Sequence, residues 1–369
     1  MTARSAVAAM TAYTLELRHA SVKLNQNESP YDFPPELKRE VLARMAERPW
    51  NLYPDFESST LRTALAKAYG LEAENILVGN GSNELLDAAV GAFVGPGTPV
   101  VFPRPTFTLY EKLITIAGGL PVPIEFEPES GLLPLDEMLR ALDGLRGAVV
   151  ILCSPNNPTG GVLPEGGLDR LLATGATVLF DRAYGDFARP VILSEAKDLF
   201  GEAVSQKRSF AVFAAQDDVI PLHDRLVTFS TFSKAWGLAA LRVGWLASTA
   251  ATCREIRKVK LPYSLNTISE TIATVALENR AIRDANVAKI IAERDRVVRF
   301  MKEIDTIETF PTSANFVAFR SNLKLDDFHK RDVLIRDISS YPRLAKCLRV
   351  SIGSRAQNDA FLTALQELA

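Results

Sequence analysis

The sequence predicts an α/β protein with two domains: a large domain built on a mostly parallel sheet between helices, and a smaller α+β domain at the C-terminus. Three observations support this prediction. The chain has 369 residues, whereas a typical domain has about 150, so two domains are expected. Short apolar segments alternate with helical patterns through the middle of the chain. After about residue 261 this alternation is replaced by a long helical pattern.

Seven short segments rich in Val, Ile, Leu and Phe are expected to form the large sheet, because each is bounded by Gly, Pro, Ser or Asp. Helical patterns such as residues 82–93 and 165–175 lie between several of them. Strands that alternate with helices predict βαβ units, and such sheets place ligands at the carboxyl ends of their strands. The predicted strands cover residues 75–79, 98–102, 120–126, 147–154, 176–181, 225–231 and 242–248.

The C-terminal part begins with a long amphipathic helical pattern over residues 264–304, with charged residues along one face. Three strand-like segments and a closing helix follow. This order of elements predicts the smaller α+β domain. Its predicted strands are residues 314–320, 332–337 and 347–353.

The expected organisation is an arm, two domains and one insertion. We expect an N-terminal arm at residues 1–30, a large domain at 31–260 and a small domain at 261–369. The start has one early arginine and a weak alanine-rich stretch, which favours an arm over a signal peptide. An insertion at about 188–224 joins two predicted core strands, and connections this long are uncommon. We expect it to be a surface excursion without a catalytic role.

The composition argues against several classes of protein. The 42 Lys and Arg residues nearly balance 44 Asp and Glu residues, for a net charge of −2. This balance argues against a nucleic-acid binder and against binding to an anionic membrane surface. A hydrophobic content of 47% is typical of a globular protein, and no apolar run reaches the roughly 18 residues of a membrane span. A cytoplasmic protein is therefore expected.

Neither the cysteines nor the histidines form a metal-binding pattern. Cys153, Cys253 and Cys347 are widely spaced and odd in number, as expected of reduced thiols rather than a disulfide framework. The three histidines share no spacing typical of metal ligands. No metal site is expected.

The strongest chemical signal is the segment TFSTFSKAWGLAALRVGW at residues 228–245. Lys234 follows an apolar strand, where desolvation lowers the pKa of its amine and prepares it for Schiff-base chemistry. Thr231, Ser233 and Arg242 offer two hydroxyls and a guanidinium suited to a phosphate dianion. On this segment alone, a surface lysine is an equal alternative.

Two polar residues follow the end of another predicted strand, in ATVLFDRAYGDF. Asp181 ends the apolar run, where a carboxylate is costly unless it is paired. A protonated pyridine nitrogen is a suitable partner, and an aspartate in this place tunes pyridoxal phosphate. A helix cap is the alternative function of Asp181. Tyr184 follows three positions later.

Two turns add polar groups at strand ends. The turn SPNNPTGG contains Asn157, whose side-chain amide can donate to a phenolate oxygen or a carboxylate. By itself, N-P-T-G is only a turn signal. Gly81 and Ser82 lie between a strand and a helix, whose N-terminus offers free N–H groups to a single phosphate. The glycine spacing differs from the dinucleotide-binding pattern.

Taken in order, these motifs resemble those of the fold type I pyridoxal-phosphate aminotransferases, and among them the histidinol-phosphate aminotransferases. The resemblance extends from about residue 23 to residue 353 and implies pyridoxal 5′-phosphate as cofactor and a homodimer with shared active sites. The similar segments are KLNQNESPY, NLYPD, VGNGSNE, RPTFTLY, SPNNPTG, DRAY, TFSKAWGLAALRVGW, PYSLN, SANF and VLIRD…LRVSIG.

The resemblance also implies a role for each motif residue. Lys234 would hold the cofactor as a Schiff base and move the substrate proton, and Asp181 would pair with the pyridine nitrogen. Tyr184 and Asn157 would hydrogen-bond the 3′-oxygen of the cofactor, and Phe107 would stack on its ring. The residues implied in binding the cofactor phosphate are Gly81, Ser82, Thr231, Ser233, Arg242 and, from the other subunit of the dimer, Tyr53.

Two arginines on predicted strands of the small domain indicate an anionic substrate. Arg336 in VLIRD and Arg349 in CLRVSIG lie among apolar residues, where a buried guanidinium needs an anionic partner. The residues by themselves support only an anionic substrate. The resemblance implies that both arginines recognise the substrate phosphate. It also implies that Asn157 is a substrate-binding residue.

The sequence departs from the family pattern at three places. Lys234 follows Asp181 by 53 positions, a longer link than is usual in the family. Phe107 stands where the family tends to have Tyr, and Asp332 stands where it tends to have Gly. No catalytic group is lost, but the assignment to the subfamily is weakened.

The expected activity is a reversible transamination in two half-reactions, in histidine biosynthesis. Histidinol phosphate and 2-oxoglutarate would give imidazole acetol phosphate and glutamate. The alternatives are an aminotransferase for aromatic or other amino acids and a threonine-phosphate decarboxylase-like enzyme of the same fold. A non-catalytic cofactor-binding or regulatory protein would need an appended DNA-binding module or a lost lysine, and the sequence shows neither.

Overall fold

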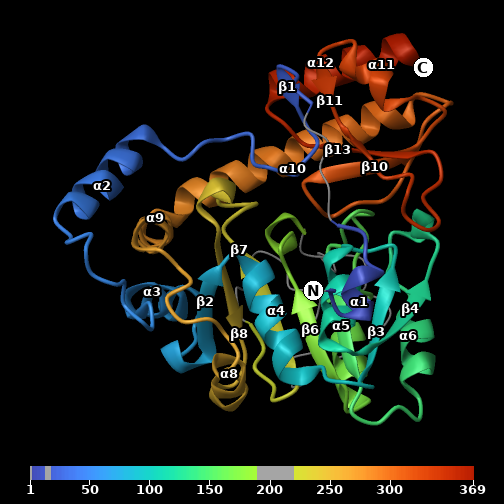
Figure 1. Cartoon of the computed structure of the whole chain (residues 1–369). Coiled ribbons are helices and arrows are strands. Elements are labelled where there is room, and N and C mark those ends of the chain that lie inside the picture. The colour runs from blue at the N-terminus through green and yellow to red at the C-terminus, as the bar shows by residue number, and fades with distance from the viewer. Residues whose placement is uncertain (1, 13–17, 189–219) are drawn as a thin grey trace, which may run out of the picture.

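The computed structural model describes residues 2–12, 18–188 and 220–369. A large sheet with helices on both faces is joined to a smaller, C-terminal group of strands and helices (Figure 1). The helices of this part of the chain are α1 (Ser5–Ala8), α2 (Pro35–Ala46), α3 (Ser59–Tyr69), α4 (Ser82–Phe93), α5 (Leu109–Ala117), α6 (Leu135–Leu142), α7 (Gly167–Ala173), α8 (Ala250–Arg257), α9 (Thr267–Glu278), α10 (Arg280–Lys302), α11 (Leu325–His329) and α12 (Arg355–Leu368).

The large sheet has seven strands in the order β2-β8-β7-β6-β5-β3-β4. All neighbouring pairs are parallel except the two that involve β8, which is antiparallel to β2 and to β7. This confirms the predicted α/β fold and all seven predicted strands. They are β2 (Ile76–Asn80), β3 (Pro99–Arg104), β4 (Leu120–Glu125), β5 (Val149–Cys153), β6 (Thr177–Asp181), β7 (Leu226–Thr231) and β8 (Val243–Ala247).

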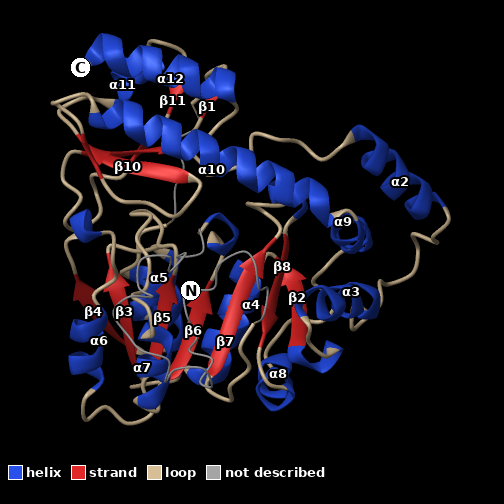
Figure 2. Ribbon diagram, turned by 180° about the vertical axis from the view of Figure 1, so that it is seen from behind, coloured by secondary structure: helices blue, strands red, loops and turns tan. Residues whose placement is uncertain are grey.

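The central strands are apolar on both sides because each face of the sheet is covered by helices. In β5, Ile151 packs into the core beneath α4 and α5, whereas Leu152 packs into the core beneath α6 and α7. Figure 2 shows α6 and α7 on one face, and Figure 1 shows α4 and α5 on the other. Successive side chains of a strand point to opposite faces. This layering leaves the strand ends as the place where polar side chains can gather.

The small domain contains an antiparallel sheet in the order β12-β13-β10-β9, packed against α10. The predicted strand at 332–337 is divided at Ile335, because its first half pairs with the N-terminal segment and its second half with β13. The remaining strands are β1 (Val22–Lys23), β9 (Glu308–Thr309), β10 (Phe316–Arg320), β11 (Val333–Leu334), β12 (Arg336–Asp337) and β13 (Cys347–Ser351).

The single long helix expected over residues 264–304 is wrong, since two helices, α9 and α10, occupy this range. The break lies at Asn279, whose φ of −115° and ψ of 35° are not helical. Its side-chain amide donates to the carbonyl of Val275 at 2.9 Å. Asparagine competes in this way with the regular helical hydrogen bonds. As a result, α9 packs against α2 and α3, whereas α10 continues to the small domain.

The N-terminal segment is attached to the small domain. Val22 and Lys23 form β1, which pairs in parallel with Val333 and Leu334 of β11. Asp332, just before β11, has a φ of +59°, the left-handed region that glycine adopts most readily. This conformation explains why a glycine suits the position better than the aspartate found here.

The structure does not test the predicted insertion or the predicted domain boundaries. Most of the expected insertion at about 188–224 lies outside the described residues, so its predicted surface position is not tested. The domain boundaries stay predictions as well. Among the helices of the described part of the chain, none combines the length and apolar character needed to cross a membrane.

Candidate active site

A cavity of about 360 Å³ lies between the carboxyl ends of the large-sheet strands and the small domain. Segments far apart in the sequence meet there, including the turn after β5, the end of β6 and the strands β12 and β13. The cavity collects most of the predicted site residues. Those that line it are Ser82, Phe107, Asn157, Asp181, Tyr184, Thr231, Ser233, Lys234, Arg242, Arg336 and Arg349.

Lys234 lies three residues beyond the end of β7, with its amine inside the cavity. The amine donates to the backbone carbonyl of Gln26 at 3.0 Å and lies 5.7 Å from the centre of the Tyr184 ring. Burial, assisted by the charge of Arg349, lowers the pKa of Lys234 to about 8. A substantial fraction of the amine is therefore neutral near physiological pH and able to attack a carbonyl.

Asp181 ends β6 and is buried at the floor of the cavity. One carboxylate oxygen, Oδ2, accepts a hydrogen bond from the Tyr110 hydroxyl at 2.8 Å, and the other accepts from the Ala183 amide at 2.9 Å. Burial raises the pKa of Asp181, and the bond from Tyr110 opposes this shift. A carboxylate held in this way suits a cationic ring nitrogen, because such a partner offsets the cost of burial.

Tyr110 also lines the cavity, although its sequence motif did not predict it as a site residue. It is fully buried in the first turn of α5, and its ring meets that of Phe107 edge to face, with centroids 5.7 Å apart. Tyr110 therefore connects the predicted stacking residue to the predicted ring-nitrogen partner. The motif RPTFTLY contained the signal, but the distance between Tyr110 and Asp181 depends on strand order.

A cradle for a phosphate is formed where α4 begins. Ser82 is the first residue of this twelve-residue helix, and Gly81 precedes it with a φ of +80°. A Cβ atom at Gly81 would lie 2.7 Å from the guanidinium of Arg242, so any other residue would fill the cradle. Arg242 donates to the Ser233 hydroxyl at 3.2 Å. Helix N–H groups, hydroxyls and a guanidinium are the groups that bind phosphate in proteins.

Arg349 and Arg336 provide the cationic wall on the small-domain side. They are directly opposite each other on the antiparallel strands β13 and β12, so both side chains leave the same face of the sheet. Like charges in this arrangement repel, and an anion between them would remove the repulsion. Arg349 donates to the Asn157 Oδ1 atom at 2.5 Å and to the Asn25 carbonyl at 3.0 Å.

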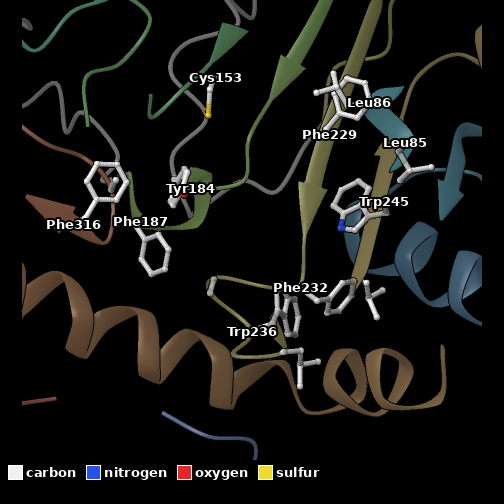
Figure 3. Packing of buried hydrophobic residues seen from close by; sticks show 14 of the residues in the cluster. Leu85, Leu86, Cys153, Tyr184, Phe187, Phe229, Phe232, Trp236, Trp245 and Phe316 are labelled. Carbon is white, nitrogen blue, oxygen red and sulfur yellow. The ribbon is translucent and has the colours of Figure 1, made fainter. Parts of the chain in front are cut away.

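Tyr184 lies between the two domains. Its ring packs edge-on against Phe316 of β10, with centroids 5.2 Å apart (Figure 3). The Asn27 side-chain amide donates to its hydroxyl at 3.1 Å. Burial raises the pKa of Tyr184 above that of an ordinary tyrosine, so the hydroxyl keeps its proton and can donate it to an acceptor in the cavity.

Tyr53 is the predicted residue that the chain does not bring to its own cavity. Its side chain is 82% exposed and stacks on Tyr263, with ring centroids 4.7 Å apart. This position is compatible with the expected role in the other subunit, which stays a prediction.

Three further cavity residues, Asn25, Gln26 and Asn27, come from the motif KLNQNESPY. The resemblance to the family includes this motif but implies no role for its residues. The position of the segment depends on β1 pairing with β11 near the other end of the chain. Such long-range pairing leaves no local pattern in the sequence.

Comparison with known proteins agrees with this geometry. The family model described as aminotransferase class I and II matches residues 20–365. A histidinol-phosphate aminotransferase from Aquifex aeolicus is 33% identical over 366 residues, covering 97% of this chain and 95% of that protein. A histidinol-phosphate aminotransferase from Chlorobium phaeobacteroides is 35% identical over 369 residues, covering 97% and 94%.

Solved structures show the same fold. The histidinol-phosphate aminotransferase of Sinorhizobium meliloti in complex with pyridoxal 5′-phosphate has a TM-score of 0.76 at 24% identity, covering 95% of this chain and 91% of that chain. A putative aminotransferase from Burkholderia pseudomallei has a TM-score of 0.78 at 25% identity, covering 95% and 99%. The family match covers nearly the whole chain and includes every element that lines the cavity. The chain therefore belongs to the class I and II aminotransferases and is a pyridoxal-phosphate-dependent enzyme of that family.

Proposed function

We propose that this enzyme is a histidinol-phosphate aminotransferase, which exchanges the amino group of histidinol phosphate with 2-oxoglutarate in histidine biosynthesis. The observation that carries the proposal is the pair Arg336 and Arg349, which face the same cavity as Lys234. Such a pair suits the phosphate of a substrate whose reacting carbon lies near the lysine amine. Curated relatives at 29–35% identity over nearly the full length carry the same name.

The residues of the cavity fit pyridoxal phosphate as cofactor. The cradle of Gly81, Ser82 and Arg242 has the groups that a phosphate needs, and the buried Asp181 suits a protonated ring nitrogen. Phe107 lies at the wall, where an aromatic side chain can stack on a ring. When bound, the cofactor supplies an electron-withdrawing ring that stabilises negative charge on the substrate carbon.

In the proposed mechanism, the side chains of this chain position the reactants and move one proton. The Nζ atom of Lys234 would hold the cofactor and, when free of it, would move the proton to and from the substrate carbon that bears the amine. Asp181 would keep the proton on the ring nitrogen, and Tyr184 and Asn157 would donate to the 3′-oxygen of the cofactor. Arg349 holds the substrate anion in place.

Glutamate is the proposed amino donor, with 2-oxoglutarate as the corresponding acceptor. Both carry two carboxylates, so the cationic wall that would bind a phosphate also offers partners for their distal carboxylate. Arg336 and Arg349 therefore would serve both half-reactions. For this shared role, the distal anionic group of each substrate must reach Arg336 and Arg349.

We further propose a cytoplasmic homodimer with shared active sites. Large exposed apolar side chains occur in residues 50–56 and 261–268, where Tyr53 stacks on Tyr263. A contiguous apolar surface of this kind is typical of a subunit interface. Tyr53 would then reach the cofactor phosphate of the other subunit. Measurement of the molar mass in solution tests this proposal, and a monomer that is fully active would contradict it.

The substrate is tested by a panel of half-reactions followed through the absorption spectrum of the bound cofactor. Histidinol phosphate, phenylalanine, aspartate and threonine phosphate are added separately to the loaded enzyme. We expect histidinol phosphate to react at least about tenfold more efficiently than phenylalanine, since its phosphate gains charged hydrogen bonds that phenylalanine cannot form. A preference for phenylalanine or aspartate, or release of carbon dioxide from threonine phosphate, would contradict the proposed substrate.

A further inference from the structure

We propose that Asn27 is a positioning residue, which orients the hydroxyl of Tyr184 toward the cavity and connects it to the small domain. This inference rests on the proposed role of Tyr184 at the cofactor. Asn27 belongs to the N-terminal segment, in a motif that has no role in the mechanism proposed above. Its side chain does not act on the substrate; it acts through the tyrosine.

Every polar group of Asn27 has a hydrogen-bond partner in the structure. Its backbone N–H donates to the Ser351 Oγ atom at 2.8 Å, and its Oδ1 atom accepts from the same hydroxyl at 3.0 Å. Its carbonyl accepts from the Asn315 side-chain amide at 3.1 Å. Its Nδ2 atom donates to the Tyr184 hydroxyl at 3.1 Å. Three contacts thus hold Asn27 on the small domain, and the fourth reaches the large domain.

The direction of the Asn27–Tyr184 bond carries the inference. A phenol hydroxyl has one proton to donate, and it can also accept hydrogen bonds. The Ser351 hydroxyl occupies Oδ1 of Asn27, which leaves the Nδ2 atom to face Tyr184 as a donor. Because Asn27 donates, Tyr184 accepts, and its own proton is left for an acceptor inside the cavity. Both side chains are buried, so water does not compete strongly for the bond.

The backbone of Asn27 fits this task. Its φ is +55°, a left-handed conformation that asparagine adopts more readily than most residues with side chains. The turn directs the side chain toward Tyr184 while the preceding carbonyl, that of Gln26, meets the Lys234 amine at 3.0 Å. Glycine also tolerates this conformation, so Asn27→Gly removes the side chain without straining the turn.

The consequence for the bound cofactor can be measured without turnover. A hydrogen bond donated to the 3′-oxygen withdraws negative charge from that atom, which lowers the proton affinity of the neighbouring nitrogen that links Lys234 to the cofactor. When Asn27 no longer orients Tyr184, this withdrawal weakens. The pH midpoint of the visible absorption band should therefore rise.

The test is a spectroscopic pH titration of four loaded proteins: wild type, Asn27→Gly, Tyr184→Phe and the double variant. We expect Asn27→Gly to raise the midpoint by about half a pH unit, in the same direction as Tyr184→Phe and by less, since a hydrogen bond of ordinary strength contributes about 1 kcal/mol. The double variant should match Tyr184→Phe alone, because coupled residues are not additive. Additive shifts, or an unchanged midpoint in Asn27→Gly, would overturn the proposal.

Two further variants separate positioning from a loss of structure. Ser351→Ala removes the contact that anchors Asn27 to the small domain and should shift the midpoint in the same direction by a smaller amount. Ser29→Ala removes hydrogen bonds to Tyr31 in the same segment and should leave the midpoint unchanged. An equal shift in Ser29→Ala would show that any change in the segment has this effect and would overturn the proposal. A wild type without a visible cofactor band would instead contradict the proposed function.

Discussion

The two halves of the cavity are built in different ways. The large-domain half takes Asp181 and Lys234 from the ends of neighbouring parallel strands, and Ser82 from the start of α4. Each of these residues lies at, or within three positions of, the end of its strand or helix. The opposite half takes Arg349 from β13 and Asn27 from the N-terminal segment, two parts of the chain that are joined through Ser351. Asn27 and Ser351 are 324 positions apart.

This difference separates two tasks. The large-domain half contains the groups suited to the cofactor, and its rigid sheet keeps them in one geometry. The small-domain half contains the arginines suited to the substrate anion. Substitution of these arginines can therefore alter substrate preference without disturbing the cofactor, whereas Asn27 is the exception in this half because it contacts Tyr184. The four predictions that follow test this separation, from the largest expected effect to the smallest.

Replacing Lys234 with alanine should remove the chemistry of the large-domain half. We expect loss of the visible cofactor band and a fall in transamination on the order of 10³-fold or more, because in the proposed mechanism the amine both binds the cofactor and moves the proton. Lys260→Ala is the matched control, since burial also lowers the pKa of Lys260, which lies outside this cavity. Retention of the band in Lys234→Ala would refute the assignment of the amine.

Replacing Arg349 with glutamine should affect mainly the substrate. We expect kcat/KM for histidinol phosphate to fall about 100-fold, since a charged hydrogen bond contributes about 1.5–3 kcal/mol, while the affinity for the cofactor changes little. Arg336→Gln should have a smaller effect in the same direction, because Arg336 is less buried. Arg320→Gln, on neighbouring β10 and paired with Glu129 and Glu308, serves as control. A larger loss of cofactor affinity than of substrate affinity would break the proposed separation.

Replacing Tyr110 with phenylalanine should affect the cofactor and spare substrate recognition. The variant keeps the ring that packs against Phe107 and removes the hydroxyl that donates to Asp181. We expect the dissociation constant of the cofactor, measured by titration of the apo-protein, to rise about tenfold. Tyr69→Phe, a buried tyrosine of α3 outside the cavity, is the control. Equal cofactor affinity in wild type and Tyr110→Phe would show that the hydroxyl has no part in holding Asp181 for the ring.

The pH dependence of cofactor capture tests the environment of Lys234. Only the neutral amine reacts, and burial lowers its pKa to about 8. The rate at which apo-protein takes up pyridoxal phosphate should therefore increase about tenfold from pH 7 to pH 9 and level off above pH 9. With a lysine of ordinary pKa, the uptake rate would continue to increase above pH 9. Stopped-flow absorption measures the rate, and a midpoint near 10.5 would contradict the buried position of the amine.

Much of the large-domain half was predictable from sequence. Short apolar runs bounded by turn residues predicted all seven strands, and the polar residues that follow β6 and β7 pointed to the cofactor groups. These features are local: an apolar run and the residue after it determine both the strand and its end. The division of residues 264–304 into α9 and α10 was not predicted, because a single asparagine, Asn279, does not interrupt the helical pattern of the sequence. In the structure its side chain bonds the Val275 carbonyl and its backbone leaves the helical region.

The contacts across the cavity could not be predicted in the same way. Tyr110 and Asp181 are 71 positions apart and meet because β3, β5 and β6 are neighbours in the sheet. Asn27 reaches Tyr184 because β1 pairs with β11. Pairing of distant strands depends on which surfaces bury each other, and neither periodicity nor turn chemistry encodes it.

The sequence by itself determined the class of fold and the residues at the strand ends, and it predicted an anionic substrate, because apolar periodicity and the chemistry of Lys, Asp and Arg are properties of short segments. Only the tertiary structure decided which of these residues share a cavity. It placed Arg336 opposite Arg349 and gave Tyr184 and Asp181 their hydrogen-bond donors. Burial then changed the chemistry of Lys234, since the pKa of an amine depends on the solvent and charges around it.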